Sequence, residues 1–321
     1  MKKRIILFTL LVLSSTLSIC FADTYKVAIV KTKDAFSYNE TLKGYKRYVG
    51  NTKKYKDRKR IKIKIDEYNI QGNAENSGKI IDEIKYREYD IVLTLGRRAF
   101  EAIKDEIKDT PVIFATMFNP YDGDGQPGED DSNVTGIEMD IPPSVQFEAL
   151  KSFVPFLQNV GVIYSDNDKN LETLANATKV ADELGLNLVQ YEVNDERDVA
   201  ETLEKLIKET DALWMIPDYS IYSKEIIKHV VLTTIENEFP FMGLSKAYVK
   251  AGALIAVSRD FQDIGRQAAI MSFNIIKDGL PDEQRILPLR KYPMVINKRT
   301  ADSIDIRIPQ WVSENTIEFF E

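Results

Sequence analysis

The sequence predicts an α/β protein of two units, each built around a doubly wound parallel sheet. Short apolar runs typical of buried strands alternate with amphipathic stretches of helical period, and this alternation is the pattern of parallel sheets. The alternation breaks at Pro142-Pro143, where one hydrophobic pattern ends before another begins. A chain of 321 residues that is 44% hydrophobic and 29% charged is long enough to bury two cores.

In the first unit, the runs YKVAIV, DIVLTL and PVIFATM predict strands that are buried on both faces. The last run ends at Asn119-Pro120, and the carboxyl ends of parallel strands are where open sheets bind ligands. We expect strands at 25–30, 61–70, 90–95, 111–117 and 134–140, and helices at 36–49, 74–87 and 97–107.

In the second unit, the same alternation restarts without any detectable sequence repeat, so the two units are similar in architecture alone. A long amphipathic helix and a late strand follow it. We expect strands at 160–164, 188–193, 212–216, 240–242, 253–257 and 294–296, and helices at 144–153, 171–184, 199–209, 221–237 and 261–278.

Residues 1–22 have the composition of a bacterial secretory signal peptide. Basic residues precede an apolar run at 5–13, which is too short to span a membrane, and a segment of small residues ends at Ala22. We expect cleavage before Asp23 and a location in the periplasm or another extracytoplasmic space.

Cys20 offers an alternative, because Leu-Ser-Ile-Cys resembles the box in which the cysteine of a lipoprotein is acylated. Ile19 stands where that box requires a small residue, so lipid anchoring is the less favoured reading. Cleavage after Ala22 would remove the single cysteine, and with it any disulfide.

The charge balance excludes two classes of partner. The leader carries three of the 43 basic residues, so the mature chain has 40 against 50 acidic residues, a net charge of −10. An acidic exported chain is a poor candidate for binding nucleic acid or anionic lipid surfaces. We interpret the basic segment 53–64 as a solvated loop and an exposed strand face.

We expect no metal, no cofactor and no catalysis. The acidic loop 122–131 begins like a calcium loop, but Pro127 occupies the position that needs glycine and no glutamate closes it. His229 is the single histidine, so neither a zinc site nor a Ser-His-Asp arrangement around Ser245 has its partners.

Several segments occur in an order and at a spacing that resemble the exported substrate-binding proteins of ABC transporters, a family that includes tryptophan and tyrosine binders. The resemblance covers nearly the whole mature chain, and its most specific parts are the NVTG segment and the GAL…D…GRQAA segment. The segments are TLGRRA (94–99), PVIFATMFNP (111–120), NVTG (133–136), VGVIYSDND (160–168), MIPD (215–218), the segment 240–269 and VINKRTADSIDIRIP (295–309).

The resemblance implies a type I periplasmic-binding-protein fold, in which two Rossmann-like lobes are joined by three crossing segments. The crossings would fall near Asp140, near Arg259 and around 280–290. The implied N-terminal lobe is 23–140 plus 259–285, and the C-terminal lobe is 141–258 plus 286–321.

The resemblance also implies a function. A small polar or amino-acid-like ligand would bind between the lobes, and hinge closure would deliver it to an ABC permease in the membrane. We expect a monomer. The alternative is a periplasmic ligand-sensing module that docks on a receptor or a sensor kinase.

A cleft of this kind needs oriented donors, which a strand-to-helix turn supplies through its free backbone N–H groups. In the first lobe, Thr94 offers a hydroxyl, Gly96 a close backbone approach and Arg97 a bidentate partner for a carboxylate. The alternative is an ordinary turn with a solvated arginine.

The end of the fourth strand offers an apolar wall and an amide, from Met117, Phe118 and Asn119. Relatives often carry an aspartate before this proline, so Asn119 removes a charge that could meet a ligand amine. The sequence therefore leaves the ligand unnamed.

In the second lobe, strand ends and turns should face the same gap. We expect Asp218 to be the partner of a cationic amino group, but any of these residues, Asp218 included, could instead be an ordinary turn cap. Tyr219 and Lys246 depart from the residues that relatives carry there. The candidate ligand residues of this lobe are Tyr164, Ser165, Asp166, Asp218, Tyr219 and Ser245.

Overall fold

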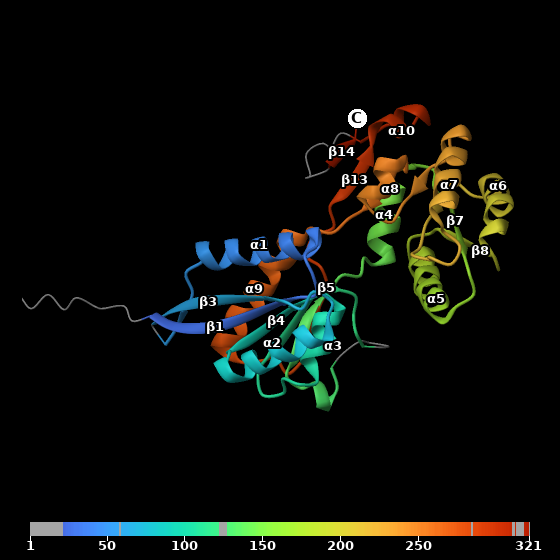
Figure 1. Ribbon diagram of the computed structural model, residues 1–321. Helices are drawn as coiled ribbons and strands as arrows, with labels where there is room; N and C mark the ends of the chain where they lie inside the picture. Colours follow the sequence, from blue (N-terminus) through green and yellow to red (C-terminus); the bar gives the residue numbers. More distant parts are fainter. Residues whose placement is uncertain are drawn as a thin grey trace, which may run out of the picture.

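The computed structural model describes residues 22–57, 59–121, 127–283, 285–309, 312 and 318–320. The expected signal peptide therefore lies outside the described residues except for Ala22, as do Cys20 and residues 122–126 of the acidic loop. Figure 1 shows two α/β lobes side by side, with connecting segments between them. No helix of the described chain is long and apolar enough to cross a membrane.

The first lobe is built on a seven-stranded sheet of order β12-β6-β5-β4-β1-β3-β2, in which β2 alone is antiparallel to its neighbour. Helices α1 and α9 cover one face, and α2 and α3 cover the other. Its elements are β1 (Ala22–Lys31), α1 (Phe36–Asn51), β2 (Tyr55–Lys56), β3 (Lys59–Asn69), α2 (Ala74–Arg87), β4 (Ile91–Leu95), α3 (Arg97–Lys104), β5 (Val112–Met117), the 3-10 turn Glu129–Asp131, β6 (Val134–Glu138), α9 (Phe261–Asp278) and β12 (Ile286–Leu287).

The second lobe is built on a sheet of order β14-β13-β11-β10-β9-β7-β8, in which β13 runs antiparallel to β11. Helices α4 and α5 pack on one face, and α6, α7 and α8 pack on the other. Its elements are α4 (Pro143–Phe153), β7 (Asn159–Tyr164), α5 (Asp168–Glu183), β8 (Asn187–Glu192), the 3-10 turn Glu196–Asp198, α6 (Val199–Glu209), β9 (Ala212–Trp214), α7 (Lys224–Glu236), β10 (Phe241–Met242), α8 (Lys246–Ala251), β11 (Ile255–Val257), β13 (Met294–Asn297), α10 (Lys298–Ser303) and β14 (Glu318–Phe320).

The expected elements are present close to their predicted bounds, and the differences have local causes. The helix expected from 221 begins at Lys224, because the Ser223 hydroxyl accepts the N–H of Ile226 and caps it. Strands β2, β12 and β14 are too short to produce a periodic signal.

The position of the third crossing differs from our expectation. We placed residues 286–321 in the second lobe, but Ile286 and Leu287 pair with Gly136 and Ile137 of β6 in the first sheet. The chain therefore leaves the first sheet after Leu287 and enters the second at Met294.

Helices α1 and α9 approach each other backbone to backbone. A Cβ atom on Gly44 would lie 2.0 Å from the carbonyl oxygen of Gln262, and one on Gly265 would lie 1.8 Å from that of Thr41. Phe36 meets Phe261 edge to face beside this contact. Because α9 follows the second crossing directly, this contact fixes the start of α9, and with it the crossing, on the first lobe.

We predict that Gly44→Ala lowers the free energy of unfolding by about 1 to 3 kcal/mol, because its methyl group collides with backbone that cannot yield. Gly50→Ala is the matched control, since it lies in the same helix with nothing within 4 Å of the added methyl. That control should stabilise the helix by roughly 0.5 to 1 kcal/mol. Chemical denaturation measures both, and equal effects would contradict the packing argument.

Candidate functional site

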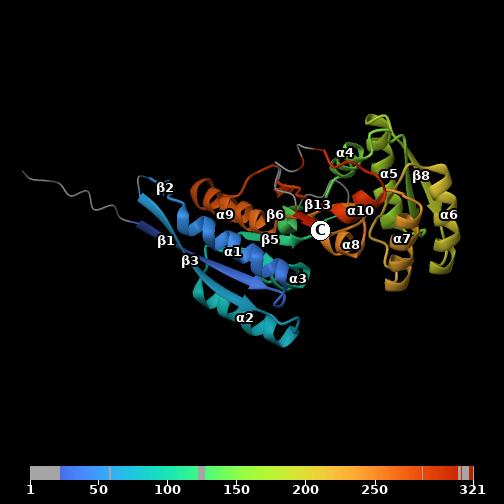
Figure 2. The ribbon, with the colours of Figure 1, turned by 90° about the horizontal axis from the view of Figure 1, so that it is seen from above.

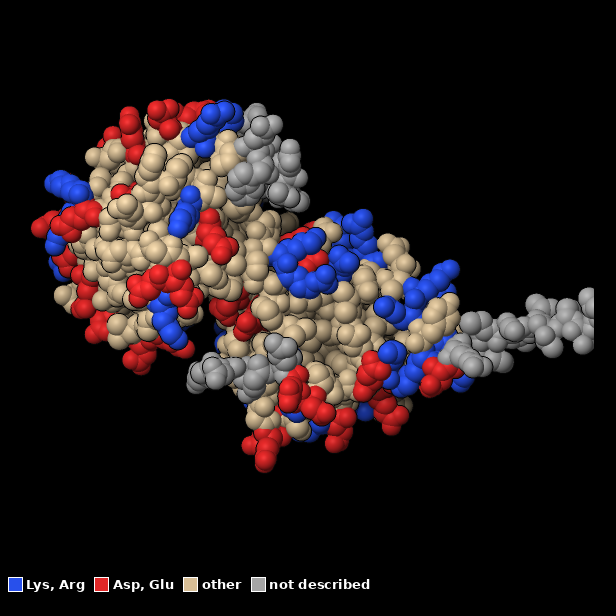
Figure 3. Space-filling model, turned by 180° about the vertical axis from the view of Figure 1, so that it is seen from behind, with Lys and Arg blue, Asp and Glu red and all other residues tan. Residues whose placement is uncertain are grey.

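The ligand cleft we expected corresponds to the region where the strand ends of the two lobes face each other. The contacts described below join the end of β5 in the first lobe to the start of α5 in the second. The space-filling view shows the surface hollowed between the two lobes (Figure 3). Seen from above, the strands of the first lobe run toward the second (Figure 2).

Phe118 is the residue that spans the gap. It is 41% exposed, and two cations lie over its ring from different parts of the chain. The Lys169 ammonium of the second lobe is 5.1 Å from the ring centroid, and the Arg259 guanidinium of the second crossing is 5.6 Å from it. Such distances are those of cation–π contacts, so this aromatic face already selects positive charge.

Arg259 holds the second crossing against the first. Its Nε donates to the carbonyl oxygen of Met139 at 2.7 Å. Burial lowers the pKa of Arg259, while Asp140 and Tyr219 act in the opposite direction. An arginine stays charged under these conditions, so the crossings meet around a fixed positive charge.

The carboxylates of Glu138 and Asp140 both lie within hydrogen-bond distance of Asn119. Its amide Nδ2 donates to Glu138 Oε2 at 3.3 Å, and its backbone N–H reaches Asp140 Oδ2 at 3.5 Å. Burial, together with the charge of Asp140, raises the pKa of Glu138, although the Asn119 bond opposes this. The negative charge that Asn119 itself lacks therefore lies on its two neighbours, which sequence reasoning missed because they belong to the first crossing.

A strained residue precedes this group in β5. Thr116 has a φ of 59°, which is rare for a β-branched residue, and the pairing of β5 with β6 shifts register between Phe114 and Met117. The Thr116 hydroxyl lies 3.1 Å from that of Thr41. Strain of this kind costs about 1 to 3 kcal/mol and gathers at functional sites. Beyond it Met117 is buried, whereas Phe118 is exposed.

The turn after β4 behaves only partly as expected. Thr94 is fully buried, and its hydroxyl donates to the Ile113 carbonyl at 3.3 Å, so it does not face the gap. Arg97 is exposed, and its Nη1 lies 3.5 Å from Glu101 of its own helix. Gly96 has a φ of 91° at the start of α3, where a Cβ would lie 2.3 Å from the Tyr38 hydroxyl.

Thr32, and not Thr94, is the threonine whose hydroxyl bonds to the backbone at the start of α3. Its hydroxyl accepts the N–H of Ala99 at 3.1 Å and donates to the Leu95 carbonyl at 3.1 Å. It is therefore Thr32, together with Tyr38, that shapes this helix start. The sequence feature that could have indicated this role is the position of Thr32, directly after strand β1 (Ala22–Lys31).

Asp218 is the centre of the corresponding edge in the second lobe. It is buried, and its two carboxylate oxygens accept five hydrogen bonds at 2.5 to 3.1 Å from Ser165, Asn170 and Ser220. Burial would raise the pKa of Asp218, but these bonds outweigh it and the pKa is lowered. The carboxylate is thus committed to its own lobe, where it orients Ser165.

The other candidates of the second lobe differ in exposure. Tyr219 is 87% exposed and Asp166 is exposed, so both are open to solvent at this edge. Tyr164 is buried. The Ser245 hydroxyl accepts the N–H of Ala247 at 3.3 Å and caps α8, which is the ordinary turn role.

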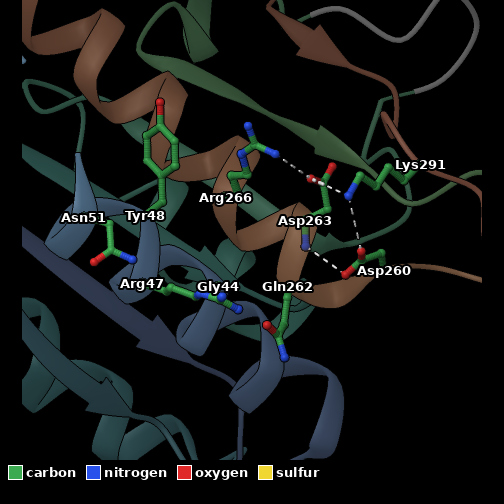
Figure 4. Close-up of a pocket in the computed structure, with 9 residues that line it drawn as sticks. All are labelled: Gly44, Arg47, Tyr48, Asn51, Asp260, Gln262, Asp263, Arg266 and Lys291. Atoms are coloured by element: carbon green, nitrogen blue, oxygen red, sulfur yellow. Dashed lines mark hydrogen bonds and ion pairs between the residues drawn. The ribbon is translucent and has the colours of Figure 1, made fainter. Parts of the chain in front are cut away.

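A hollow of about 430 Å3 lies elsewhere in the first lobe, between α1, the start of α9 and the third crossing. Figure 4 shows Lys291 between two carboxylates, with its Nζ 3.9 Å from Asp260 and 3.7 Å from Asp263. These ion pairs link the third crossing to the segment that follows the second. The hollow is lined by Gly44, Arg47, Tyr48, Asn51, Asp260, Gln262, Asp263, Arg266 and Lys291.

Within the described residues, no group of three or more His, Cys, Asp or Glu side chains is arranged to hold a metal ion. The site is therefore built from an aromatic ring, two cations, two carboxylates and backbone groups. Such a set suits recognition of a small charged molecule.

We predict that Asp218→Asn destabilises the protein by about 2 to 3 kcal/mol, because an amide nitrogen would face donors that need an acceptor. The lowered pKa gives wild-type stability that is present above the unfolded pKa and is lost as pH falls below about 4. Unfolding at pH 7 and pH 3 measures this. The control Asp166→Asn, at an exposed neighbouring position, should change the free energy of unfolding little. If wild type and Asp218→Asn differed in stability by the same amount at both pH values, the charged form of Asp218 would not be the source of the stability.

Comparisons with known proteins bear on this geometry. A tyrosine-binding protein of Clostridioides difficile (strain R20291) is 22% identical over 265 residues, which are 81% of this chain and 74% of that protein. The ligand-free, open structure of a substrate binding protein with adhesive properties from Clostridium difficile has a TM-score of 0.77 at 17% identity, covering 92% of this chain and 99% of that one. An ABC domain from Streptococcus pneumonia in complex with L-Trp has a TM-score of 0.59 at 23% identity, covering 93% and 100%.

These likenesses confirm the expected fold, two α/β lobes of the type I periplasmic-binding-protein kind. Residues 26–319 match the family described as ABC transporter substrate binding protein, which spans both sheets. The chain therefore belongs to the ABC transporter substrate-binding protein family.

Proposed function

We propose that this protein captures a small zwitterionic ligand, an amino acid with an aromatic or apolar side chain, between its lobes and delivers it to an ABC permease. The observation that carries this proposal is the meeting of both charge signs around one exposed aromatic ring. Phe118 lies beside the cations of Lys169 and Arg259, and Asn119 next to it binds Glu138. The tyrosine-binding relative and the L-Trp complex support an amino acid.

Each end of such a ligand has a partner of opposite charge. Its ammonium group would bind Glu138 and Asp140, whose mutual repulsion a cation relieves. Its carboxylate would bind the cations over Phe118. Ser165 and Tyr219 would contact it from the second lobe.

Delivery to a permease requires two states, and the crossings supply the hinge. We propose lobes of residues 23–140 plus 259–287 and residues 141–258 plus 294–321, with closure about the crossings near Asp140, Arg259 and Lys291. A ligand that touches both lobes stabilises the closed form by its greater affinity for that form. Export through the leader at 1–22 would place the protein where such permeases collect their substrates.

We predict that L-tyrosine or L-tryptophan raises the melting temperature and lowers the radius of gyration. A ligand that binds only the folded state stabilises by RT ln(1 + [L]/Kd), which is about 2.7 kcal/mol at a hundredfold excess over Kd. Thermal shift screening of amino acids, nucleosides and small organic acids, followed by small-angle scattering, measures this. The absence of any response across that library would contradict ligand capture.

We predict that Glu138→Gln weakens binding of the amino acid at least about tenfold, which corresponds to about 1.4 kcal/mol. The substitution keeps the shape and the contact to Asn119 but removes the charge. Glu148→Gln, at an exposed position of α4, is the matched control and should leave affinity unchanged. Calorimetry with the deaminated analogue makes the test sharp, since that analogue should bind both proteins equally. If Glu138→Gln weakened binding of the amino acid and of the analogue equally, Glu138 would not be the residue that recognises the ammonium group.

A further inference from the structure

One edge of the first sheet carries a surface of positive charge that the ligand cleft does not use. This basic edge consists of Lys53, Lys54, Arg60, Lys62 and Lys64, all of which are exposed. They lie in the loop before β2 and in the first half of β3. Strands β1 and β3 are parallel and both begin at this end, so the basic edge lies at the opposite end of the sheet from the strand ends at the cleft.

The register of the sheet gathers part of this charge on a single face. Arg60, Lys62 and Lys64 are alternate residues of β3, so their side chains point to the same side at a spacing of roughly 7 Å. The residues between them, such as Ile61, pack on the other side against α1 and α9. Lys26 of β1 pairs with Lys64 and extends the row.

The charges of the basic edge have no acidic partners of their own. Within the described residues, none of its five cations makes a hydrogen bond or an ion pair, whereas their neighbours Lys56 and Lys59 do. Lys56 donates to the Ile276 carbonyl at 2.8 Å, and Lys59 lies 3.4 Å from Asp23. Tyr55, which is 49% exposed, stands among the cations and pairs with Arg60.

The chain enters the described structure at this edge. Strand β1 begins at Ala22, which pairs with Arg60, and residues 1–21 precede it with the basic and apolar segments of a predicted leader. In Figure 1 the N-terminal strand leaves the lobe on the side away from the second lobe. In Figure 3 the Lys and Arg side chains gather over that end of the first lobe. Were the chain anchored through Cys20, the alternative to cleavage after Ala22, the anchor would hold the basic edge toward the membrane.

The acidic net charge does not oppose such an approach. Electrostatic interactions between exposed charges are largely screened beyond about 8 Å at physiological ionic strength. A surface that touches the basic edge is therefore attracted by the local cations, while the acidic residues of the second lobe are too distant to cancel them. The expectation that we drew from the net charge describes the molecule as an average and does not address this edge.

We propose that the basic edge docks on an anionic phospholipid surface. Contact at this end of the sheet would rest the first lobe on the membrane and leave the cleft open to solvent beside it. Lysines attract the headgroup phosphates, and an exposed tyrosine is a residue that prefers the membrane–water interface.

The test is cosedimentation of residues 22–321, which contain every described residue, with phosphatidylcholine vesicles that contain or lack phosphatidylglycerol. We expect binding to the anionic vesicles at least about tenfold stronger than to the neutral ones, and weaker binding at high salt. The triple variant Arg60→Gln, Lys62→Gln, Lys64→Gln should bind the anionic vesicles at least about tenfold more weakly than the wild type. The control variant Lys179→Gln, Lys208→Gln, Lys228→Gln removes the same charge from exposed positions of the second lobe and should keep it.

Several outcomes would overturn the proposal. Equal binding to both kinds of vesicle, or equal losses in the two triple variants, would show that no local surface is involved. Binding of the wild type to heparin without binding to anionic vesicles would assign the edge to another polyanion. Self-association of the first triple variant with unchanged vesicle binding would show that the lysines only keep the sheet edge from pairing with another copy.

Discussion

The close packing of α1 on α9 is the constraint on which the geometry of the cleft depends. Helix α9 belongs to the first lobe although the chain reaches it only after passing through the second, so it must be held there by contact alone. Gly44 and Gly265 allow the two backbones to touch. Because Arg259 stands two residues before α9, this contact also places its guanidinium between Phe118 and the Met139 carbonyl. The positive side of the proposed ligand site would therefore be a consequence of helix packing.

The carboxylates of the site are held in opposite electrostatic conditions, and this difference separates structural from ligand-binding roles. Asp218 is stabilised in its charged form by donors of its own lobe, which lowers its pKa, so a ligand has little to add. Glu138 is buried beside another carboxylate, and its raised pKa means that its charge is unfavourable in the empty protein. In the proposed site, a ligand cation would remove that penalty. Affinity for an ammonium group would thus be greatest at the carboxylate whose charge is least stabilised by the protein itself.

The sequence predicted the fold, and it predicted the strand ends at which we propose the site, but fewer of the side chains there. Strand positions and strand ends follow from apolar periodicity, and the positive φ of Gly96 follows from its place between strand and helix. Thr94 could not be placed in the same way, because both faces of a central parallel strand are buried and only the last residue or the turn is free. Of the partners of Asp218, Ser220 is local, but Ser165 and Asn170 come from a segment about 50 residues away, so no local pattern indicated that three of its five hydrogen bonds are already made.

The residues that the sequence analysis overlooked lie on the crossings, and the crossings also limit how the lobes can move. Glu138 and Asp140 were overlooked because a segment predicted to connect lobes was not considered as part of the site. Arg259 is half-buried, and breaking its bond to the Met139 carbonyl would leave a partly desolvated charge without its acceptor, which is costly. We therefore expect closure to keep this bond and to bend the chain on either side of it. A rotation of that kind moves Lys169 relative to Phe118 while Arg259 stays in place, so the two cations over the ring have different tasks. In the proposed closure, Arg259 would stay fixed to the hinge, and the distance of Lys169 from the ring would differ between the open and the closed cleft.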